Sequence, residues 1–377
     1  MFAAQDQDTR RAGARGLTRN HGAMARRLRR AAAGALCAAA VAFPLISAAG
    51  AQAATTTPPT YTPLTLVNGW TNYGSGSANA AVTSINGIVH LKGAIKTGGT
   101  DPIAFTLPVG DRPASNVTVP VDLISATFGT LNIAPSGLVS VSSEQSWNNA
   151  QQFTGLDGVS FATSGSSFTK LTLTNGWINY TPPMARAAVR SISGIVHLRG
   201  AVMTEGSGVV PFTLPTGFRP AHTVYVPVAL CGSSNGRLDI FPSGEVDVEA
   251  MNGPQWIPQC PVSLDGAWFA KSASLYTPLT LQNGWISYGS GTTSPAVRKI
   301  NGIVHFEGAL YNGANSFAFT LPVGFRPSHY VYTSVDMNVA NRGHILIAPN
   351  GQVNVYGEGT QSEATLFTSL DGVSFAT

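Results

Sequence analysis

The sequence has few cysteines, few charged residues and none of several short motifs that mark common enzyme and cofactor sites. It holds 3 cysteines and 11% charged residues in 377, with no Walker loop, His-Glu-x-x-His pair or EF-hand loop. No carboxylate pair recurs as glycosidase chemistry requires, and no histidine is placed to suggest a serine triad. We therefore expect a protein that is not an enzyme and that uses no cofactor and no metal.

The positive charge of the chain belongs to its first 53 residues. The formal net charge is +4, but residues 1–53 hold eight arginines and two aspartates, so 14 basic and 16 acidic residues follow them. Nucleic-acid binding needs a clustered cationic surface, and none remains. We expect no nucleic-acid partner.

Residues 1–53 have the pattern of an export signal peptide. Arginines precede an apolar, alanine-rich segment, and Ala51-Gln52-Ala53 supplies the small residues of a cleavage site. Met24 is an alternative start to Met1. An uncleaved membrane anchor is the other reading, since the apolar segment approaches spanning length, but weak alanine hydrophobicity favours cleavage. We expect a secreted, extracellular protein without membrane insertion after cleavage.

Two cysteines, Cys231 and Cys260, remain after cleavage. An oxidising compartment favours a disulfide between them, which would stabilise the fold by roughly 3–4 kcal/mol in the chain-entropy model. Two unpaired buried thiols are the alternative. No histidine pair lies nearby, so the spacing does not suit zinc.

Beyond the leader the chain consists of three copies of one pattern, each about a hundred residues long. Asn-Gly-Trp occurs at Asn68-Gly69-Trp70, Asn175-Gly176-Trp177 and Asn283-Gly284-Trp285. In the same register follow Gly-Ile-Val-His from Gly87, Gly194 and Gly302, Phe-Thr-Leu-Pro from Phe105, Phe212 and Phe319, and Leu-Asp-Gly from Leu156, Leu264 and Leu370. The order and phase predict three repeats over residues 61–163, 168–271 and 275–377.

Apolar residues within each copy alternate with a period of two, as in a β-strand, and no stretch shows sustained helical spacing. Strands are predicted in the first copy near residues 64–70, 82–85, 88–96, 103–107, 117–124, 130–134, 138–142 and 158–162. The predicted core of that copy is Trp70, Val89, Leu91, Phe105, Leu107, Leu131, Ile133, Leu156 and Phe161. The pattern indicates an all-β protein of three tandem jelly-roll-like antiparallel β-sandwiches.

Several elements together resemble a module of phage minor tail and tail-fibre proteins that also appears in secreted bacterial proteins. The third copy carries all of them, at Tyr288-Gly289-Ser290-Gly291, Gly302–Gly308, Phe319–Pro327 and Ser369–Phe375. The first copy departs from the pattern at Gly110-Asp111-Arg112, and the second at Tyr180-Thr181-Pro182-Pro183 and Ala267-Trp268-Phe269. The resemblance implies a jelly-roll-like head that assembles as a trimer and recognises a cell-surface receptor, often a saccharide.

If one copy of this module normally trimerises, three copies in one chain predict a monomer with an intramolecular pseudo-trimer. An apolar residue repeated on the outward strand face marks the expected interface. The repeat-interface candidates are Ile88, His90, Ile195, His197, Ile303 and His305. Converging histidines also suit zinc, but packed interface histidines are favoured. Beads on a string are the rival arrangement.

Other recurring polar residues have structural interpretations. An aspartate precedes glycine at Asp157, Asp265 and Asp371, which is typical of turns, and pairing with Arg112, Arg219 and Arg326 is the alternative. Glu245, Asp247 and Glu249 alternate along one predicted strand, and we interpret them as a solvated face. Neither pattern points to chemistry.

Aromatic residues that do not recur between the copies are the candidates for ligand binding. They are Trp147, Trp256, Trp268, Tyr311, Tyr330 and Tyr356. Exposed aromatic rings pack against the apolar face of a sugar. The sequence therefore favours a secreted, non-enzymatic protein that binds cell-surface or extracellular polysaccharide. A structural or adhesive wall-associated protein without a discrete pocket is the alternative.

Overall fold

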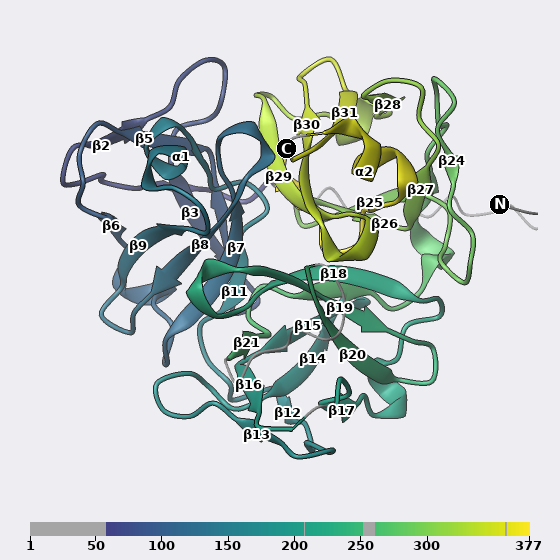
Figure 1. Cartoon of the computed structure of the whole chain (residues 1–377). Helices are drawn as coiled ribbons and strands as arrows, with labels where there is room; N and C mark the ends of the chain where they lie inside the picture. Colours follow the sequence, from purple (N-terminus) through teal and green to yellow (C-terminus); the bar gives the residue numbers. More distant parts are fainter. Residues whose placement is uncertain (1–57, 207, 252–260, 359) are drawn as a thin grey trace, which may run out of the picture. The chain divides into compact units, whose positions relative to one another are not determined.

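The chain folds into short antiparallel strands, because its alternating apolar residues let one face of each strand pack inward. The computed structural model describes residues 58–206, 208–251, 261–358 and 360–377 (Figure 1). The described residues belong to one compact unit, Thr55–Thr377. The predicted signal peptide, 1–53, lies outside the described residues.

The first copy contains eleven described strands and one short α-helix. They are β1 (Thr62–Pro63), β2 (Trp70–Asn72), β3 (Ala81–Ile85), β4 (Ile88–Lys92), β5 (Ala94–Thr97), β6 (Ile103–Thr106), β7 (Val117–Asp122), β8 (Phe128–Ile133), β9 (Leu138–Ser143), α1 (Trp147–Gln152), β10 (Thr154–Gly155) and β11 (Ser160–Ala162).

The second and third copies repeat this order of strands. The second contains β12 (Thr169–Lys170), β13 (Trp177–Asn179), β14 (Ala188–Ile192), β15 (Ile195–Arg199), β16 (Ala201–Thr204), β17 (Phe212–Thr213), β18 (Val224–Ala229), β19 (Asn235–Ile240), β20 (Glu245–Ala250), β21 (Val262–Ser263) and β22 (Trp268–Ala270). The third contains β23 (Thr277–Pro278), β24 (Ile286–Ser287), β25 (Ala296–Ile300), β26 (Ile303–Glu307), β27 (Ala309–Tyr311), β28 (Phe317–Thr320), β29 (Val331–Asp336), β30 (Arg342–Ile347), β31 (Gln352–Gly357), α2 (Gln361–Leu366), β32 (Thr368–Ser369) and β33 (Ser374–Ala376).

Each copy forms three antiparallel sheets. In the first copy their strand orders are β1-β3-β4-β11, β10-β5-β2 and β6-β9-β8-β7. The other copies have the corresponding sheets, β12-β14-β15-β22, β13-β16-β21 and β17-β20-β19-β18, then β23-β25-β26-β33, β24-β27-β32 and β28-β31-β30-β29. The predicted all-β, sandwich-like character is confirmed.

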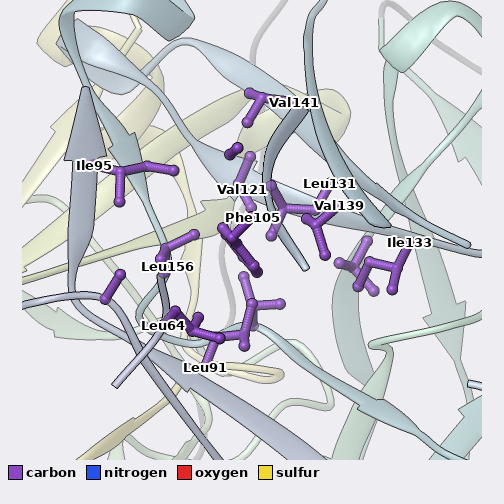
Figure 2. Packing of buried hydrophobic residues seen from close by; sticks show 14 of the residues in the cluster. Leu64, Leu91, Ile95, Phe105, Val121, Leu131, Ile133, Val139, Val141 and Leu156 are labelled. Carbon is purple, nitrogen blue, oxygen red and sulfur yellow. The ribbon is translucent and has the colours of Figure 1, made fainter. Parts of the chain in front are cut away.

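The first copy's core lies between its two four-stranded sheets. Figure 2 shows Leu91 of β4 packing with Phe105, Leu131 and Val139 of the β6–β9 sheet. All nine core residues predicted for this copy are buried, at 0–3% exposure. Burying each large apolar side chain contributes about 1.5–3 kcal/mol, so the inward rows of the strands stabilise the fold.

Two strand predictions were wrong in their bounds. The strand predicted over 88–96 is interrupted at Gly93, where φ is +100°, so β4 and β5 lie in different sheets. A Cβ at Gly93 would lie 2.6 Å from two backbone carbonyl oxygens, and only glycine fits there. Within 64–70, only Trp70 belongs to a named strand.

The short helix α1 was not predicted, because six residues give too little periodicity for a helical pattern to emerge. Ser146 caps it by accepting a hydrogen bond from the Asn148 backbone N–H. Among the helices of the described ranges, none is long and apolar enough to cross a bilayer.

Candidate functional site

The six repeat-interface candidates come together around one small cavity. They lie on β4, β15 and β26, each the second strand of a hairpin whose first-copy turn is Asn86-Gly87. The cavity, about 30 Å³ in volume, is lined by Ile88, His90, Ile195, His197, Ile303 and His305 together with hairpin residues of all three copies. The outward face of each strand therefore packs against the other copies.

The histidines of this cavity are neutral at neutral pH. Burial lowers the pKa of His90 to about 4. Burial and the neighbouring His90 lower that of His197 to about 3, and the pKa of His305 lies well below its usual value for the same reasons. His305 packs edge-on against the Trp268 ring at 4.8 Å. Within the described ranges, no three His, Cys, Asp or Glu side chains are placed to hold a metal ion.

Hairpin tips of neighbouring copies are joined by arginines. Arg190 Nη1 donates to the Asn86 carbonyl of the first copy at 3.1 Å, and Arg298 Nη1 donates to the Ser193 carbonyl of the second at 3.3 Å. The matching position of the first copy is Thr83, which is too short for this contact.

One backbone hydrogen bond recurs between each pair of copies. Asn116 N donates to Pro183 O at 3.2 Å, Thr223 N to Gly291 O at 2.9 Å, and Tyr330 N to Gly76 O at 2.9 Å. The donors are equivalent positions that immediately precede β7, β18 and β29. The first copy thus donates to the second, the second to the third and the third to the first.

The outer face of each four-stranded β6–β9-type sheet meets the next copy, and we name the three contacts by the copies involved. The first–second junction joins the β7–β9 face to residues 180–184, 229–233 and 261–263. The second–third junction joins the β18–β20 face to residues 336–340 and 367–369. The third–first junction joins the β29–β31 face to residues 122, 144–145 and 153–155.

At each of two junctions, a serine hydroxyl of one copy donates a hydrogen bond to a backbone carbonyl of the other copy. Ser263 Oγ donates to Thr118 O at 2.6 Å, and Ser369 Oγ donates to Tyr225 O at 2.8 Å. Gly155 holds this position at the third–first junction, where a Cβ would lie 3.3 Å from Tyr332 O. The backbone approach is therefore similar at all three junctions, although the side chains differ.

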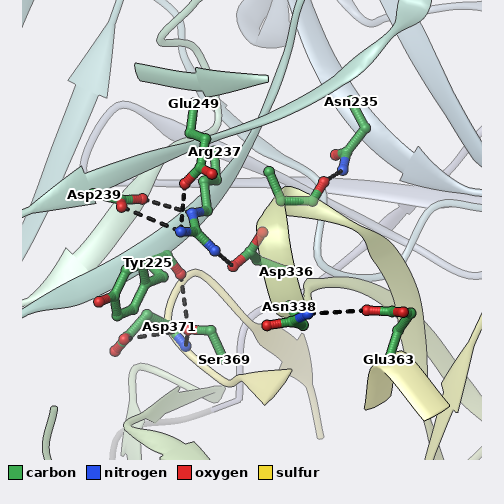
Figure 3. A network of polar contacts seen from close by, with 11 residues as sticks. Tyr225, Asn235, Arg237, Asp239, Glu249, Asp336, Asn338, Glu363, Ser369 and Asp371 are labelled. Atoms are coloured by element: carbon green, nitrogen blue, oxygen red, sulfur yellow. Dashed lines mark hydrogen bonds and ion pairs between the residues drawn. The ribbon is translucent and has the colours of Figure 1, made fainter. Parts of the chain in front are cut away.

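The second–third junction contains a buried ion cluster centred on Arg237 (Figure 3). Arg237 contacts Asp239 at 2.7 Å, Asp336 at 3.5 Å and also Glu249. The Asp336 side chain is 0% exposed. Burial raises the pKa of Asp336 well above its usual range against the opposing effect of Arg237, and it raises that of Asp239 to about 6. Arg237 offsets the cost of these carboxylates.

The third–first junction uses different charged groups. Arg342 pairs with Glu144 of the first copy and Glu358 of the third, while His344 Nδ1 lies 3.0 Å from an Asp122 carboxylate oxygen. Burial raises the pKa of Asp122, and His344 opposes that rise. His344 therefore takes the partnering position that Arg237 takes at the second–third junction.

Aromatic triads fill two junctions. At the second–third junction, Phe367 packs edge-on against Tyr225 at 5.1 Å and Tyr288 at 4.7 Å. At the third–first junction, Phe153 packs against Tyr332 at 5.0 Å and Tyr73 at 4.9 Å. The equivalent residues at the first–second junction are Pro261, Thr118 and Tyr180. Two of the three rings are absent there. In the sequence, this difference shows as a divergence between the copies at Thr118 and Pro261.

The aromatic ligand candidates are not gathered in one site. Trp147 of α1 packs against Trp70 at 6.0 Å, and Tyr311 packs against Tyr288 at 5.6 Å. Tyr356 packs against His344 at the third–first junction. Tyr330 is 38% exposed. These four rings belong to different parts of the surface or to contacts between copies.

Trp268 and Trp256 are the remaining two aromatic candidates. Trp268 is 1% exposed and packs with Ile195, Tyr276 and Ala296, so the structure corrects its expected surface role because no ring face is accessible to a sugar. Trp256 lies outside the described residues. Its role in ligand binding stays a prediction.

The aspartates that precede glycine in all three copies form turns and do not pair with arginines. Asp157, Asp265 and Asp371 accept the backbone N–H groups of Gly93, Gly200 and Gly308 at 3.2, 3.0 and 3.2 Å. Burial raises the pKa of Asp265 and Asp371 to about 7. The suggested arginine partners instead donate their Nε–H groups to Leu107, Leu214 and Leu321 carbonyls. The pairing alternative was therefore wrong.

Two features of the second copy are its acidic strand and the loop before β19. Glu249 belongs to the Arg237 cluster, so the acidic alternation of β20 is only partly a solvated face. A Gly-x-Ser-x-Gly string, the pattern of a serine nucleophile elbow, occupies Gly232–Gly236. It lies between the 3-10 turn Cys231–Ser233 and β19, not in the strand-turn-helix setting of a nucleophile elbow.

The bridge predicted between Cys231 and Cys260 stays a prediction, because Cys260 lies outside the described residues. Comparisons with protein-family models, curated proteins and solved structures found no match to this chain. Its function is therefore argued from its own geometry.

Proposed function

We propose that this is a secreted, non-enzymatic recognition protein whose three jelly-roll-like copies form a pseudo-threefold head that binds cell-surface or extracellular saccharide. The observation that carries the proposal is the backbone hydrogen bond that recurs from Asn116 to Pro183, from Thr223 to Gly291 and from Tyr330 to Gly76. A head-to-tail contact that returns to the first copy closes a ring, whereas one that does not return extends a string.

The histidine cavity and the three junctions support the same arrangement. Ile88, Ile195 and Ile303 would expose apolar surface on each copy alone, and together they line one small cavity. Burying such surface stabilises association between copies. One chain would thus build the kind of head that separate chains form in the resembling phage modules.

A recognition role also suits the chemistry of the buried ionisable groups. The Asp265 carboxyl accepts a hydrogen bond within its own copy, and Arg237 pairs with acids around it. These groups hold the structure together, and their partners are protein atoms. Proteins that hold a polymer without altering it need surfaces and pockets, not an acid–base pair.

Small-angle scattering of the exported chain tests the arrangement. A single compact particle with the radius of gyration of a globular protein is expected, about 20 Å for this length. An elongated particle, with separated maxima in the distance distribution, would refute the ring.

Binding to immobilised saccharides tests the function. The exported chain should bind at least one neutral polysaccharide or oligosaccharide on a glycan array, and heat-unfolded chain should not. A negative result across wall polymers and common saccharides would instead favour a structural or adhesive protein. Hydrolysis of any bound polysaccharide would contradict the non-enzymatic role.

A further inference from the structure

The first–second junction holds a large, partly open cavity. Its volume is about 660 Å³, within the range of about 300–1,000 Å³ that small-molecule sites occupy. It lies where the other junctions hold their aromatic triads, and its lining includes Thr118, Tyr180 and Pro261. The cavity therefore occupies the space of the two rings that this junction lacks.

Stability does not explain why this cavity is left unfilled. Phe367 and Phe153 show that the fold accommodates a phenylalanine at the position of Pro261, and Tyr225 and Tyr332 show the same for Thr118. An unfilled cavity forfeits packing contacts and destabilises the protein. The junction is thus less well packed than its two counterparts, while the neighbouring Ser263 Oγ to Thr118 O bond keeps the copies in register.

The described part of the lining carries no formal charge at neutral pH. Among its described residues there is no Asp, Glu, Lys, Arg or His, whereas the second–third junction places Arg237 and Asp239 on the equivalent face. Thr130 and Asn132 replace that charged pair. A carboxylate or phosphate ligand would be desolvated here without a cation to pair with it, which is costly. The described lining therefore favours uncharged ligands over charged ones.

Hydrogen-bonding groups in the lining are of two kinds. Asn132 is held by Thr118 at 3.0 Å and Ser142 at 3.1 Å, so its orientation is fixed. Asn116, Ser140 and Tyr180 also line the cavity, and no hydrogen bond joins their side chains to other described residues. These amide and hydroxyl groups are available for a ligand, while Tyr180 supplies an aromatic ring.

We propose that this cavity is a binding site for a neutral saccharide of one or two sugar rings, and this inference rests on the proposed function. The apolar face of a pyranose packs on the Tyr180 ring, and its hydroxyls bond to the Asn116 amide and the Ser140 hydroxyl. The other two junctions have aromatic rings in this place, so the described residues form this site at one junction and not at three.

Calorimetry with defined probes tests the site. The exported chain is titrated with glucose, galactose, N-acetylglucosamine and their disaccharides, and with glucuronic acid and N-acetylneuraminic acid as charged probes. At least one neutral probe should bind, and the charged probes should bind at least tenfold more weakly. Stronger binding of a charged probe would overturn the assignment of ligand class.

Refilling the cavity locates the site. The double variant Thr118→Tyr/Pro261→Phe copies the rings of the second–third junction and should lose at least tenfold in affinity for the bound probe. Tyr332→Phe, which keeps its ring at the third–first junction, is the control and should bind as the natural chain does. Thermal melting and circular dichroism report whether each variant folds.

A gentler variant keeps the test decisive if the refilled chain fails to fold. Asn116→Ala/Ser140→Ala removes two hydrogen-bonding groups and adds no volume, and it should lose at least fivefold in affinity with an unchanged melting temperature. Undiminished binding by a folded refilled chain, or by this variant, would overturn the cavity as the site while leaving saccharide recognition intact. Failure of every saccharide to bind the natural chain would overturn both proposals.

Discussion

Removing Arg237 should destabilise the protein strongly, because it leaves a buried carboxylate without its cation. Arg237 Nη1 lies 3.5 Å from Asp336 Oδ2, and the Asp336 side chain is 0% exposed. Coulomb attraction at that distance is about 5 kcal/mol for an effective dielectric constant near 20. Loss of one partner of a buried pair typically costs about 3–5 kcal/mol. We expect Arg237→Thr to lower the free energy of unfolding by that amount in urea denaturation.

The first–second junction supplies the matched control. Its equivalent residues are Thr130 and Ala229, so Arg237→Thr/Asp336→Ala copies a pair of residues that the fold already contains. This double variant should recover at least about 2 kcal/mol of the loss, because no fully buried carboxylate remains unpaired. A loss below about 1 kcal/mol for Arg237→Thr, or a double variant no more stable than the single one, would contradict the argument.

The pH dependence of Arg237→Thr gives a second measurement. Burial already raises the Asp336 pKa in the folded chain, and losing Arg237 raises it further. The folded state then binds a proton that the unfolded state releases, so stability falls as pH rises above the unfolded value of 3.8. The deficit of Arg237→Thr against the natural chain should therefore shrink as pH is lowered from 8 toward 4.

Three further outcomes follow from the turns and the cysteines. Burial raises the Asp265 pKa to about 7, so the contribution of Asp265 to stability falls as pH rises from about 4 to about 7. In Asp265→Asn, the urea midpoint should therefore fall less over that pH range than in the natural chain. An unchanged dependence of the urea midpoint on pH would count against this. Mass spectrometry of the non-reduced exported chain should find Cys231 bonded to Cys260, and reduction should cost about 3 kcal/mol, whereas two free thiols would exclude the bridge. Gly93→Ala should lower the free energy of unfolding by about 2 kcal/mol or more. Gly98→Ala, whose added Cβ meets open space, should change it by less than about 0.5 kcal/mol. Equal effects of the two substitutions would refute the close approach at Gly93.

The sheets and core were predictable because they depend on local alternation. Val89 and Leu91 face the core, and Ile88 and His90 face the other copies, as a period of two requires. The break at Gly93 was harder to predict from the sequence, because the alternation of apolar residues continues where the chain passes from one sheet to the other. The helix α1 was missed for a related reason, since two turns leave no repeated spacing.

The contacts between copies could be predicted only in part. Repetition at Ile88 and its equivalents marked a shared face, because a feature kept in all copies reports a common environment. The ion cluster left no such mark, since Thr130 and His344 stand at the positions equivalent to Arg237. The aromatic triads recur at only two of the three junctions. Trp268 was misplaced because a tryptophan present in one copy alone looks like a surface feature, whereas it packs against His305 of the next copy.

The different fillings of the three junctions have an evolutionary consequence. In an assembly of three identical chains, a mutation that exchanges a phenylalanine for proline alters every interface at once, and the losses add together. A gene that encodes its three copies in tandem escapes this constraint, because Pro261 can arise while Phe153 and Phe367 persist. Tandem copies can therefore differ at one junction while the two aromatic junctions keep their packing.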